Sequence, residues 1–175
     1  WLDVSTGINP RSWPVPPIPA TVWQRLPEAE DGLEKAAAAY YGTSHLLPVA
    51  GSQAAIQALP LLREPGPVGV LHPGYAEHAH AWQRAGHQVE ALAVDALDRA
   101  ADRLAALVLI HPNNPTGQRF DLAMLLDWWA RLAARGGWLV VDEAFMDVTP
   151  EDSLAGRIGL PGLIVLRSLG KFFGL

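Results

Sequence analysis

Residues 163-LIVLRSLGKFFGL-175 join a short apolar run to a lysine. The run from Leu163 to Leu166 follows Pro161-Gly162, and its length and composition predict a strand that is buried on both faces. Lys171 lies just past the carboxyl end of this strand, where open α/β sheets bind their ligands. A partly desolvated lysine amine at such a place is a candidate nucleophile toward a carbonyl group. Taken alone, the stretch favours an ordinary exposed loop lysine, and the other strands reverse that preference.

Two further apolar runs also end in polar side chains. Residues 107–110 precede 111-HPNNPTG-117, and residues 138–141 precede 142-DEAF-145. The carboxyl ends of parallel strands lie on one edge of a sheet. An amide pair, a carboxylate and the lysine are therefore predicted to be neighbours.

These three kinds of side chain match the needs of one cofactor. A buried, ionised Asp142 needs a cationic partner, such as a protonated pyridinium ring. Lys171 can react with an aldehyde, and an amide of the pair Asn113-Asn114 can hydrogen-bond a phenolic oxygen beside that aldehyde. Pyridoxal 5'-phosphate (PLP) carries all three groups, and proteins hold it by a lysine Schiff base with a carboxylate on the ring nitrogen.

The motifs NNPTG, DEAF and SLGK, in this order and with this spacing, resemble those of the aspartate-aminotransferase superfamily of PLP enzymes (class I/II, fold type I). The opening, 2-LDVSTGINPRSWP-14, resembles more particularly the threonine-phosphate decarboxylases of cobalamin biosynthesis, which are relatives of the histidinol-phosphate aminotransferases. The resemblance implies an α/β fold with a doubly wound, mostly parallel sheet. It divides the chain into an N-terminal arm with the first helix, 1–44, and a PLP-binding large domain, 45–175.

Both ends of the sequence resemble cut ends. The first residue is Trp1 rather than Met, and the last four, 172–175, are apolar or glycine. We therefore expect a fragment whose large domain is truncated at its C-terminus and whose small C-terminal domain is absent.

The composition is that of an ordinary globular protein. The chain has 175 residues, 50% hydrophobic content and a formal net charge of −5, so the length predicts about one domain. The sequence has no basic patch, so we expect no nucleic-acid partner. No apolar run approaches the ~18 residues of a membrane span. The sequence has no cysteine, which excludes disulfides and cysteine metal ligands. With no signal-peptide pattern, these features fit a cytoplasmic protein.

Residues 1–31 are rich in proline and predict an extended arm rather than a helix. The resemblance lays this arm across the mouth of the active site, with Gly7 and Asn9 near the substrate; the alternative is a plain surface linker. Residues 33–41 predict a helix that ends at Gly42. By resemblance Tyr40, which matches best by spacing, or else Tyr41 reaches the cofactor phosphate of a neighbouring subunit in a homodimer; the alternative is helix packing.

The segment 48-PVAGSQAAIQAL-59 predicts a tight turn at Gly51 and a helix that Ser52 caps. The free N–H groups of a helix N-terminus can bind an anion. By resemblance Ser52 and Gln53, together with Ser168, bind the cofactor phosphate; the alternative is an ordinary capped helix.

A strand at 68–71 precedes 72-HPGYAEHAHAW-82. By resemblance Tyr75 stacks on the pyridine ring, and the alternative is a core-filling tyrosine. His78 and His80 are two apart, so on a helix they share no face, and no carboxylate completes a metal site. Both are predicted to be solvated, and we expect no metal.

The remaining pattern alternates strand and helix: a strand at 89–94, a short helix at 96–104 and an amphipathic helix at 121–135. Trp128 and Trp129 on the last helix are predicted to be core or interface residues. Such alternation predicts a doubly wound, mostly parallel sheet. No GxGxxG follows a strand, so a dinucleotide fingerprint is absent.

The resemblance also implies a reaction: decarboxylation of L-threonine O-3-phosphate, a small phosphorylated amino acid, to (R)-1-aminopropan-2-yl phosphate. A histidinol-phosphate-type aminotransferase is the alternative, and a non-catalytic binding domain with the same fold is a further one. One position departs from the family pattern. Many relatives carry a tyrosine that donates to the phenolic oxygen where this chain has Phe145, so Asn114 is expected to hold that oxygen with less help.

Overall fold

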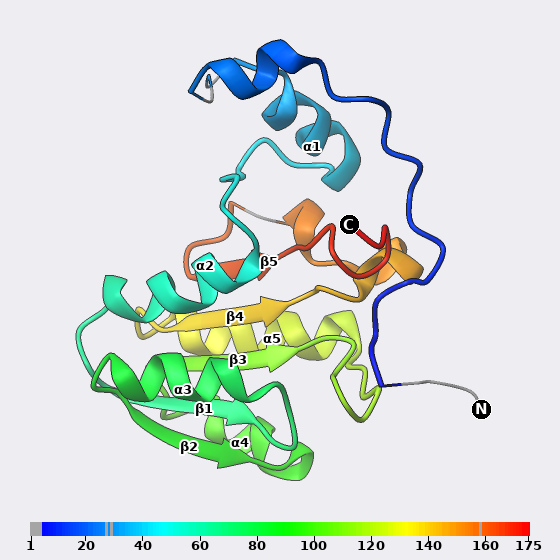
Figure 1. Cartoon of the computed structure of the whole chain (residues 1–175). Helices are drawn as coiled ribbons and strands as arrows, with labels where there is room; N and C mark the ends of the chain where they lie inside the picture. Colours follow the sequence, from blue (N-terminus) through cyan, green and yellow to red (C-terminus); the bar gives the residue numbers. More distant parts are fainter. Residues whose placement is uncertain (1–4, 27, 29, 158) are drawn as a thin grey trace.

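The computed structural model describes residues 5–26, 28, 30–157 and 159–175 (Figure 1). Five strands form one sheet in the order β2-β1-β3-β4-β5, and every pairing is parallel. The strands are β1 (Pro67–Leu71), β2 (Gln88–Leu92), β3 (Ala106–Ile110), β4 (Trp138–Asp142) and β5 (Leu163–Leu166). The α-helices are α1 (Leu33–Tyr41), α2 (Ser52–Ala58), α3 (Ala76–Arg84), α4 (Leu97–Ala100) and α5 (Leu122–Ala133).

Helices cover both faces of the sheet, with α2 and α3 on one side and α4 and α5 on the other (Figure 1). Strands buried on both faces are apolar throughout rather than alternating, as the run Ala106–Ile110 illustrates. Toward α3, the strands bury Val68, Val70, Ala106, Val108 and Val140 around Trp82. Toward α5, they bury Leu107, Leu109, Leu139 and Val141 against Leu125, Trp128 and Leu132. The predicted doubly wound α/β fold and the buried position of Trp128 are confirmed.

The strand order reverses between β1 and β3. The chain passes from β1 through α3 to β2 on one side, and adds β3, β4 and β5 on the other. Ligands of open α/β sheets bind outside the carboxyl ends of the strands at such a reversal. In register, Ile110, Asp142 and Leu166 lie side by side across β3, β4 and β5. The polar segments that follow these strands therefore begin at the same edge, as predicted.

Three predictions need correction. Within β5 only Leu163 and Leu166 are buried, and the two residues between them are half-buried, because β5 is an edge strand that pairs with β4. β2 ends at Leu92. The predicted helix at 96–104 is reduced to the single turn of α4 after a 3₁₀ turn, η3 (Val94–Ala96). The chain has to return to the sheet there, where the Ala105 amide donates to the Pro67 carbonyl at 2.8 Å.

The N-terminal arm is irregular between residues 5 and 26 apart from one 3₁₀ turn, η1 (Ala20–Gln24). The parts of the predicted arm and of the opening motif at residues 1–4, 27 and 29 lie outside the described residues. Four further 3₁₀ turns connect the larger elements: η2 (Leu59–Leu62), η4 (Met146–Val148), η5 (Pro150–Asp152) and η6 (Ala155–Arg157). Across the described part of the chain, no helix has the length and apolar character to cross a lipid bilayer.

Candidate active site

Asp142 ends β4 with both carboxylate oxygens hydrogen-bonded, although the residue is only 4% exposed. Its Oδ1 accepts from the Ala144 amide at 3.1 Å, and its Oδ2 lies 2.9 Å from Nε2 of His78 on α3. Each carboxylate oxygen keeps a further lone pair after these bonds. Asp142 can therefore still accept a proton donor from a ligand at the sheet edge.

His78 is a residue of the candidate site that the sequence analysis missed. It was predicted to be solvated together with His80; His80 is exposed, but His78 is 1% exposed. The prediction failed because the buried stripe of α3 consists of His78, Ala81 and Trp82, at positions i, i+3 and i+4. A histidine in register with two apolar residues was the available signal. In the described part of the chain, no group of three or more metal-binding side chains occurs.

The segments after β1 and β3 are tied together. The side-chain Nδ2 of Asn113 donates to the Pro73 carbonyl at 2.9 Å and to the Thr116 hydroxyl at 2.7 Å. Asn114 is exposed beside it. Tyr75 directly precedes α3, 43% exposed, with its ring centroid 6.3 Å from that of His78 in an edge-on contact. Tyr75, His78 and Asp142 thus form a chain of contacts from the solvent to the end of β4.

Lys171 is the fifth residue after β5 and is half-buried, with Nζ 5.7 Å from the centre of the Phe145 ring. Phe145 comes from the segment after β4, so the lysine faces the neighbouring strand end. The Ser168 hydroxyl accepts from the Gly170 amide at 3.2 Å and closes the turn that carries Lys171.

The N-terminal arm runs along the same turn. The Asn9 amide donates to the Lys171 carbonyl at 2.9 Å, and the Asn9 side chain donates to the Phe172 carbonyl at 2.8 Å. The Trp13 amide donates to the Phe173 carbonyl at 2.7 Å. Figure 1 shows the arm passing the carboxyl edge of the sheet beside the last residues of the chain. Residues more than 160 positions apart are therefore held together at the candidate site.

The arm, the β4 segment and the lysine turn enclose a hollow of about 370 Å³. Gly7 and Asn9, both predicted near the substrate, line it together with Phe145, Val148 and Lys171. Gly7 approaches Phe145 so closely that a Cβ on Gly7 would lie 2.6 Å from the ring. The Asn9 side chain already contacts backbone groups of Phe172 and Arg11.

The other predicted phosphate ligands, Ser52, Gln53 and Tyr40, lie at the start of α2 and at the end of α1. Gly51, with φ of 79°, is the N-cap of α2, and Ser52 is its first helical residue without a side-chain capping bond. Ser52 was therefore wrongly predicted as the cap, because the left-handed turn at Gly51 places the helix start directly after it. The Gln53 side chain donates to Glu77 at 2.9 Å. The Tyr40 hydroxyl donates to Oδ1 of Asp147 at 3.1 Å in the same chain.

The residues after Asp142 form a buried ion cluster with Arg167 that the sequence analysis did not identify. The side chains of Glu143 and Asp147 are fully buried, and that of Arg167 is 9% exposed. Arg167 donates to Oε2 of Glu143 at 2.9 Å and forms an ion pair with Asp147. Burial raises the pKa of Glu143 even though the Ser153 hydroxyl, the Leu154 amide and Arg167 hydrogen-bond its carboxylate. Burial disfavours the charge on Arg167, but the two carboxylates together raise the pKa of its guanidinium.

His111 follows β3 but is a packing residue. It is 1% exposed, its ring is stacked on that of Phe120, and its Nδ1 accepts from the Phe120 amide at 3.3 Å. Burial, with a smaller contribution from the charge of Arg119, lowers the pKa of His111 to about 4. The imidazole is therefore neutral near pH 7.

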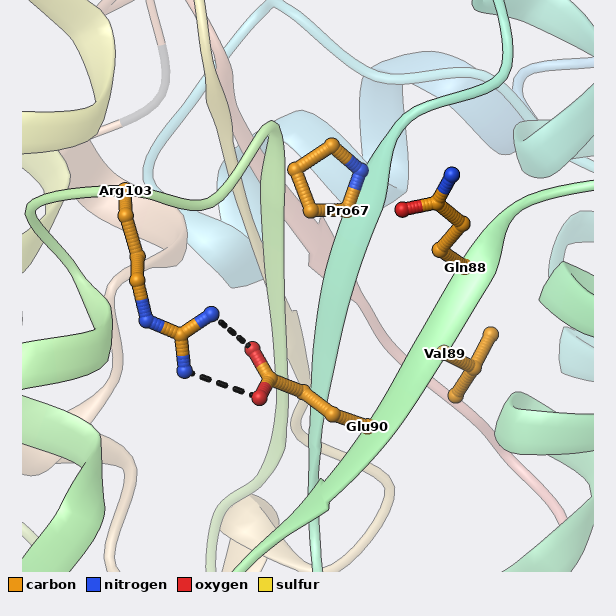
Figure 2. A pocket seen from close by; sticks show the side chains of 5 residues that line it. All are labelled: Pro67, Gln88, Val89, Glu90 and Arg103. Atoms are coloured by element: carbon orange, nitrogen blue, oxygen red, sulfur yellow. Dashed lines mark hydrogen bonds and ion pairs between the residues drawn. The ribbon is translucent and has the colours of Figure 1, made fainter.

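A second hollow, of about 260 Å³, lies at the opposite end of the sheet (Figure 2). It is lined by Pro67 and Gln88, which begin β1 and β2, and by the ion pair of Arg103 with Glu90 at 2.6 Å. The two charges neutralise each other across the hollow, and none of the predicted site residues reaches it. The carboxyl edge of the sheet remains the candidate site.

A doubly wound parallel sheet with a lysine and an aspartate after adjacent strands is the framework of one large enzyme class. Residues 26–175 match the model of the family described as aminotransferase class I and II. The chain therefore belongs to that family.

The relatives agree with this assignment. A threonine-phosphate decarboxylase of Pseudomonas aeruginosa is 60% identical over 175 residues, which are 100% of this chain and 53% of that protein. The chain thus spans about half the length of this curated relative.

Solved structures share the fold. L-threonine-O-3-phosphate decarboxylase from Porphyromonas gingivalis has a TM-score of 0.73 at 21% identity, over 86% of this chain and 50% of that one. The histidinol-phosphate aminotransferase from Sinorhizobium meliloti, solved in complex with pyridoxal-5'-phosphate, has a TM-score of 0.71 at 24% identity, over 82% of this chain and 43% of that one.

Proposed function

We propose that this chain is the PLP-binding part of a decarboxylase that converts L-threonine O-3-phosphate to (R)-1-aminopropan-2-yl phosphate in cobalamin biosynthesis. The observation that carries the proposal is the placement of Asp142 and Lys171 after adjacent, in-register parallel strands. The identity with the Pseudomonas aeruginosa decarboxylase supports the choice of substrate.

The residues at the end of β4 fit the pyridine ring of PLP. Asp142 would keep the ring nitrogen protonated, and His78 holds the carboxylate from the other side at 2.9 Å. Tyr75 would stack on the ring, and Asn114 would donate to its phenolic oxygen. Phe145 cannot donate to that oxygen, because its ring has no hydroxyl. Bound PLP supplies an electron-accepting ring that stabilises charge at a substrate carbon when one of its bonds breaks.

Lys171 would hold the cofactor covalently, and its Nζ would serve as a general acid or base beside the substrate. Ser52, Gln53 and Ser168 would bind the phosphate, with Tyr40 of the partner subunit. This requires the side chains of Gln53 and Tyr40 to exchange their present acidic partners, Glu77 and Asp147, for the phosphate.

The substrate would enter between the arm and the lysine turn. Gly7 and Asn9 line that hollow opposite Lys171, and Asn114 would complete the contact surface. The walls contributed by Phe145 and Val148 are apolar, which suits the methyl group of a threonine derivative.

The first test is the visible absorption of the purified protein after addition of PLP. Lys35 and Lys171 are the two lysines of this chain, so Lys171→Ala has a matched control in Lys35→Ala. We expect a band that borohydride abolishes in the wild type and in Lys35→Ala, and no such band in Lys171→Ala. An identical band in Lys171→Ala would contradict the role of this lysine.

The second test separates decarboxylation from transamination in a protein that carries this chain at the length of its relatives. Carbon dioxide released from L-threonine O-3-phosphate supports the proposal. Conversion of a 2-oxo acid acceptor to an amino acid with histidinol phosphate supports the alternative aminotransferase. A folded protein that forms no borohydride-sensitive band and turns over neither substrate would support a non-catalytic binding domain.

The proposal includes a homodimer in the cytoplasm. The arm and the segments around α1 and α2 expose large apolar side chains, such as Trp23, Leu26 and Leu47, and surfaces of this kind mark interaction sites. A molecular mass in solution equal to one chain would contradict the homodimer.

A further inference from the structure

We propose that Arg167 is a positioning residue for Lys171, holding the lysine turn at a fixed place relative to Asp142; this inference rests on the function proposed above. Arg167 directly follows β5 and lies four residues before the lysine. Its partners Glu143 and Asp147 lie one and five residues after Asp142. The guanidinium therefore bridges the two strand ends that carry the proposed chemistry.

The bridge begins at the backbone. The Glu143 amide donates to the Leu166 carbonyl at 2.9 Å, which continues the pairing of β4 and β5 by one residue. The Arg167 side chain then extends the link, with Nη1 donating to Oε2 of Glu143 at 2.9 Å and to the Ser153 hydroxyl at 3.1 Å. Its Nη2 donates to Oδ1 of Asp147.

Both ends of the lysine turn rest on the same segment, residues 143–147. Arg167 contacts that segment through Glu143 and Asp147, and Lys171 contacts it through the Phe145 ring, 5.7 Å from Nζ. Between them, the turn is closed by the Gly170 amide on the Ser168 hydroxyl. A displacement of Arg167 would therefore be passed to the lysine through a short, internally bonded turn.

The cluster also reaches α1. Oδ1 of Asp147 accepts from the Tyr40 hydroxyl as well as from Arg167, and the guanidinium lies 4.9 Å from the centre of the Tyr41 ring. One cation thus sets the position of the lysine turn, of the segment after Asp142 and of the first helix.

The geometry demands arginine. A guanidinium presents a planar fork of donors that can serve two carboxylates at once, whereas a lysine ammonium is a compact point charge. Arg167→Lys keeps the positive charge but cannot maintain both carboxylate contacts and the Ser153 contact together. A purely electrostatic role would survive this substitution, and a positioning role would not.

The matched control is Arg131 on α5. It also donates to several carboxylates, those of Asp98, Asp102 and Asp127, and its side chain is 25% exposed. It lies in the last turn of α5, which leads to the start of β4, and two of its partners lie on α4 and just after it. Arg131→Lys therefore makes the same chemical change without touching the proposed site.

Two readouts are measured in a protein that carries this chain at the length of its relatives. The first is amine labelling of the cofactor-free protein, with the modification of Lys171 quantified against that of the exposed Lys35 by mass spectrometry. The second is the dissociation constant for PLP from an absorption titration. We expect Arg167→Lys to change the labelling ratio and to weaken PLP binding by roughly tenfold, which corresponds to about 1.4 kcal/mol of lost interaction.

Arg131→Lys should leave both readouts within about twofold of the wild type, because such surface ion pairs contribute little. A folded Arg167→Lys with the wild-type labelling ratio and dissociation constant would overturn the proposal. If Arg167→Lys does not fold, Asp147→Asn is measured instead; it keeps the side-chain shape, and unchanged values would again overturn it. Failure of the wild type to bind PLP would contradict the proposed function, while the labelling ratio would still test Arg167.

Discussion

Nε2 of His78 lies 2.9 Å from Oδ2 of Asp142, and both side chains are buried. The contact joins the stripe of α3 that packs on the sheet to the carboxyl end of β4. A buried carboxylate is costly unless it is hydrogen-bonded, and the helix supplies the donor. On the sheet-facing surface of α3, His78 therefore makes a polar contact, whereas Ala81 and Trp82 on the next turn make apolar contacts.

Removal of the His78 ring should leave Oδ2 of Asp142 without a donor. We expect His78→Leu to lower the free energy of unfolding by about 1–3 kcal/mol, the cost of an unsatisfied buried group. His78→Gln, whose amide can place a donor near the same point, should lose less. Urea unfolding of both variants measures the difference, and equal losses would show that packing rather than the hydrogen bond matters at this position.

The side chain of Asn9 should hold the arm against the lysine turn. Asn9→Asp keeps the acceptor for the Arg11 amide but loses the donor to the Phe172 carbonyl. One hydrogen bond contributes about 1 kcal/mol net, so the detached arm should become about fivefold more populated. Limited trypsin digestion measures this as faster cleavage after Arg11, with cleavage after the exposed Arg25 as the internal reference. An unchanged ratio of the two cuts would contradict the contact.

Gly7 should be intolerant of a side chain. In Gly7→Ala the new Cβ would lie 2.6 Å from the Phe145 ring, so the ring or the arm has to shift from its present place beside Lys171. We expect weaker binding of PLP or substrate by roughly tenfold, which corresponds to about 1.4 kcal/mol of lost interaction. Gly156→Ala is the control, because a Cβ there meets only the Tyr41 carbonyl at 3.9 Å. Similar binding constants in the two variants would rule out a close arm.

The free energy of unfolding should decrease as the pH is lowered, because His111 is buried in its neutral form. Its pKa is about 4 in the folded chain against an ordinary value of 6.5. Between these values the unfolded chain takes up a proton that the folded chain does not, so stability is lost as the pH falls from 6.5 toward 4. The loss is about 3 kcal/mol at most.

The contribution of His111 is isolated by comparison with His111→Asn. Asparagine can still accept from the Phe120 amide but does not titrate, so this variant should lose less stability than the wild type between pH 6.5 and 4. His80→Asn, at an exposed histidine, is the control and should follow the wild type. Parallel curves for His111→Asn and the wild type would contradict the assignment.

The sequence itself determined which strand ends carry the residues of the candidate site. Uninterrupted apolar runs such as 106–110 read as strands buried on both faces, and parallel strands share one carboxyl edge. That rule alone brings Asp142 and Lys171 together. Helix α1 and its C-cap, Gly42 with φ of 71°, were also predictable, because they depend on local propensity and on the left-handed turn that glycine permits.

The tertiary structure decided which side chains support those residues. His78 and Arg167 carry no local signal of their partners, since Asp142 lies 64 positions from the first and Glu143 lies 24 from the second. The arm contacts Lys171 through a backbone hydrogen bond from Asn9. Backbone groups are common to nearly all residue types, so the sequence carries no signal of this contact. The local sequence pattern determines which side chains of an element are buried and where each strand ends. The pairing of buried polar groups depends instead on how distant segments pack against one another.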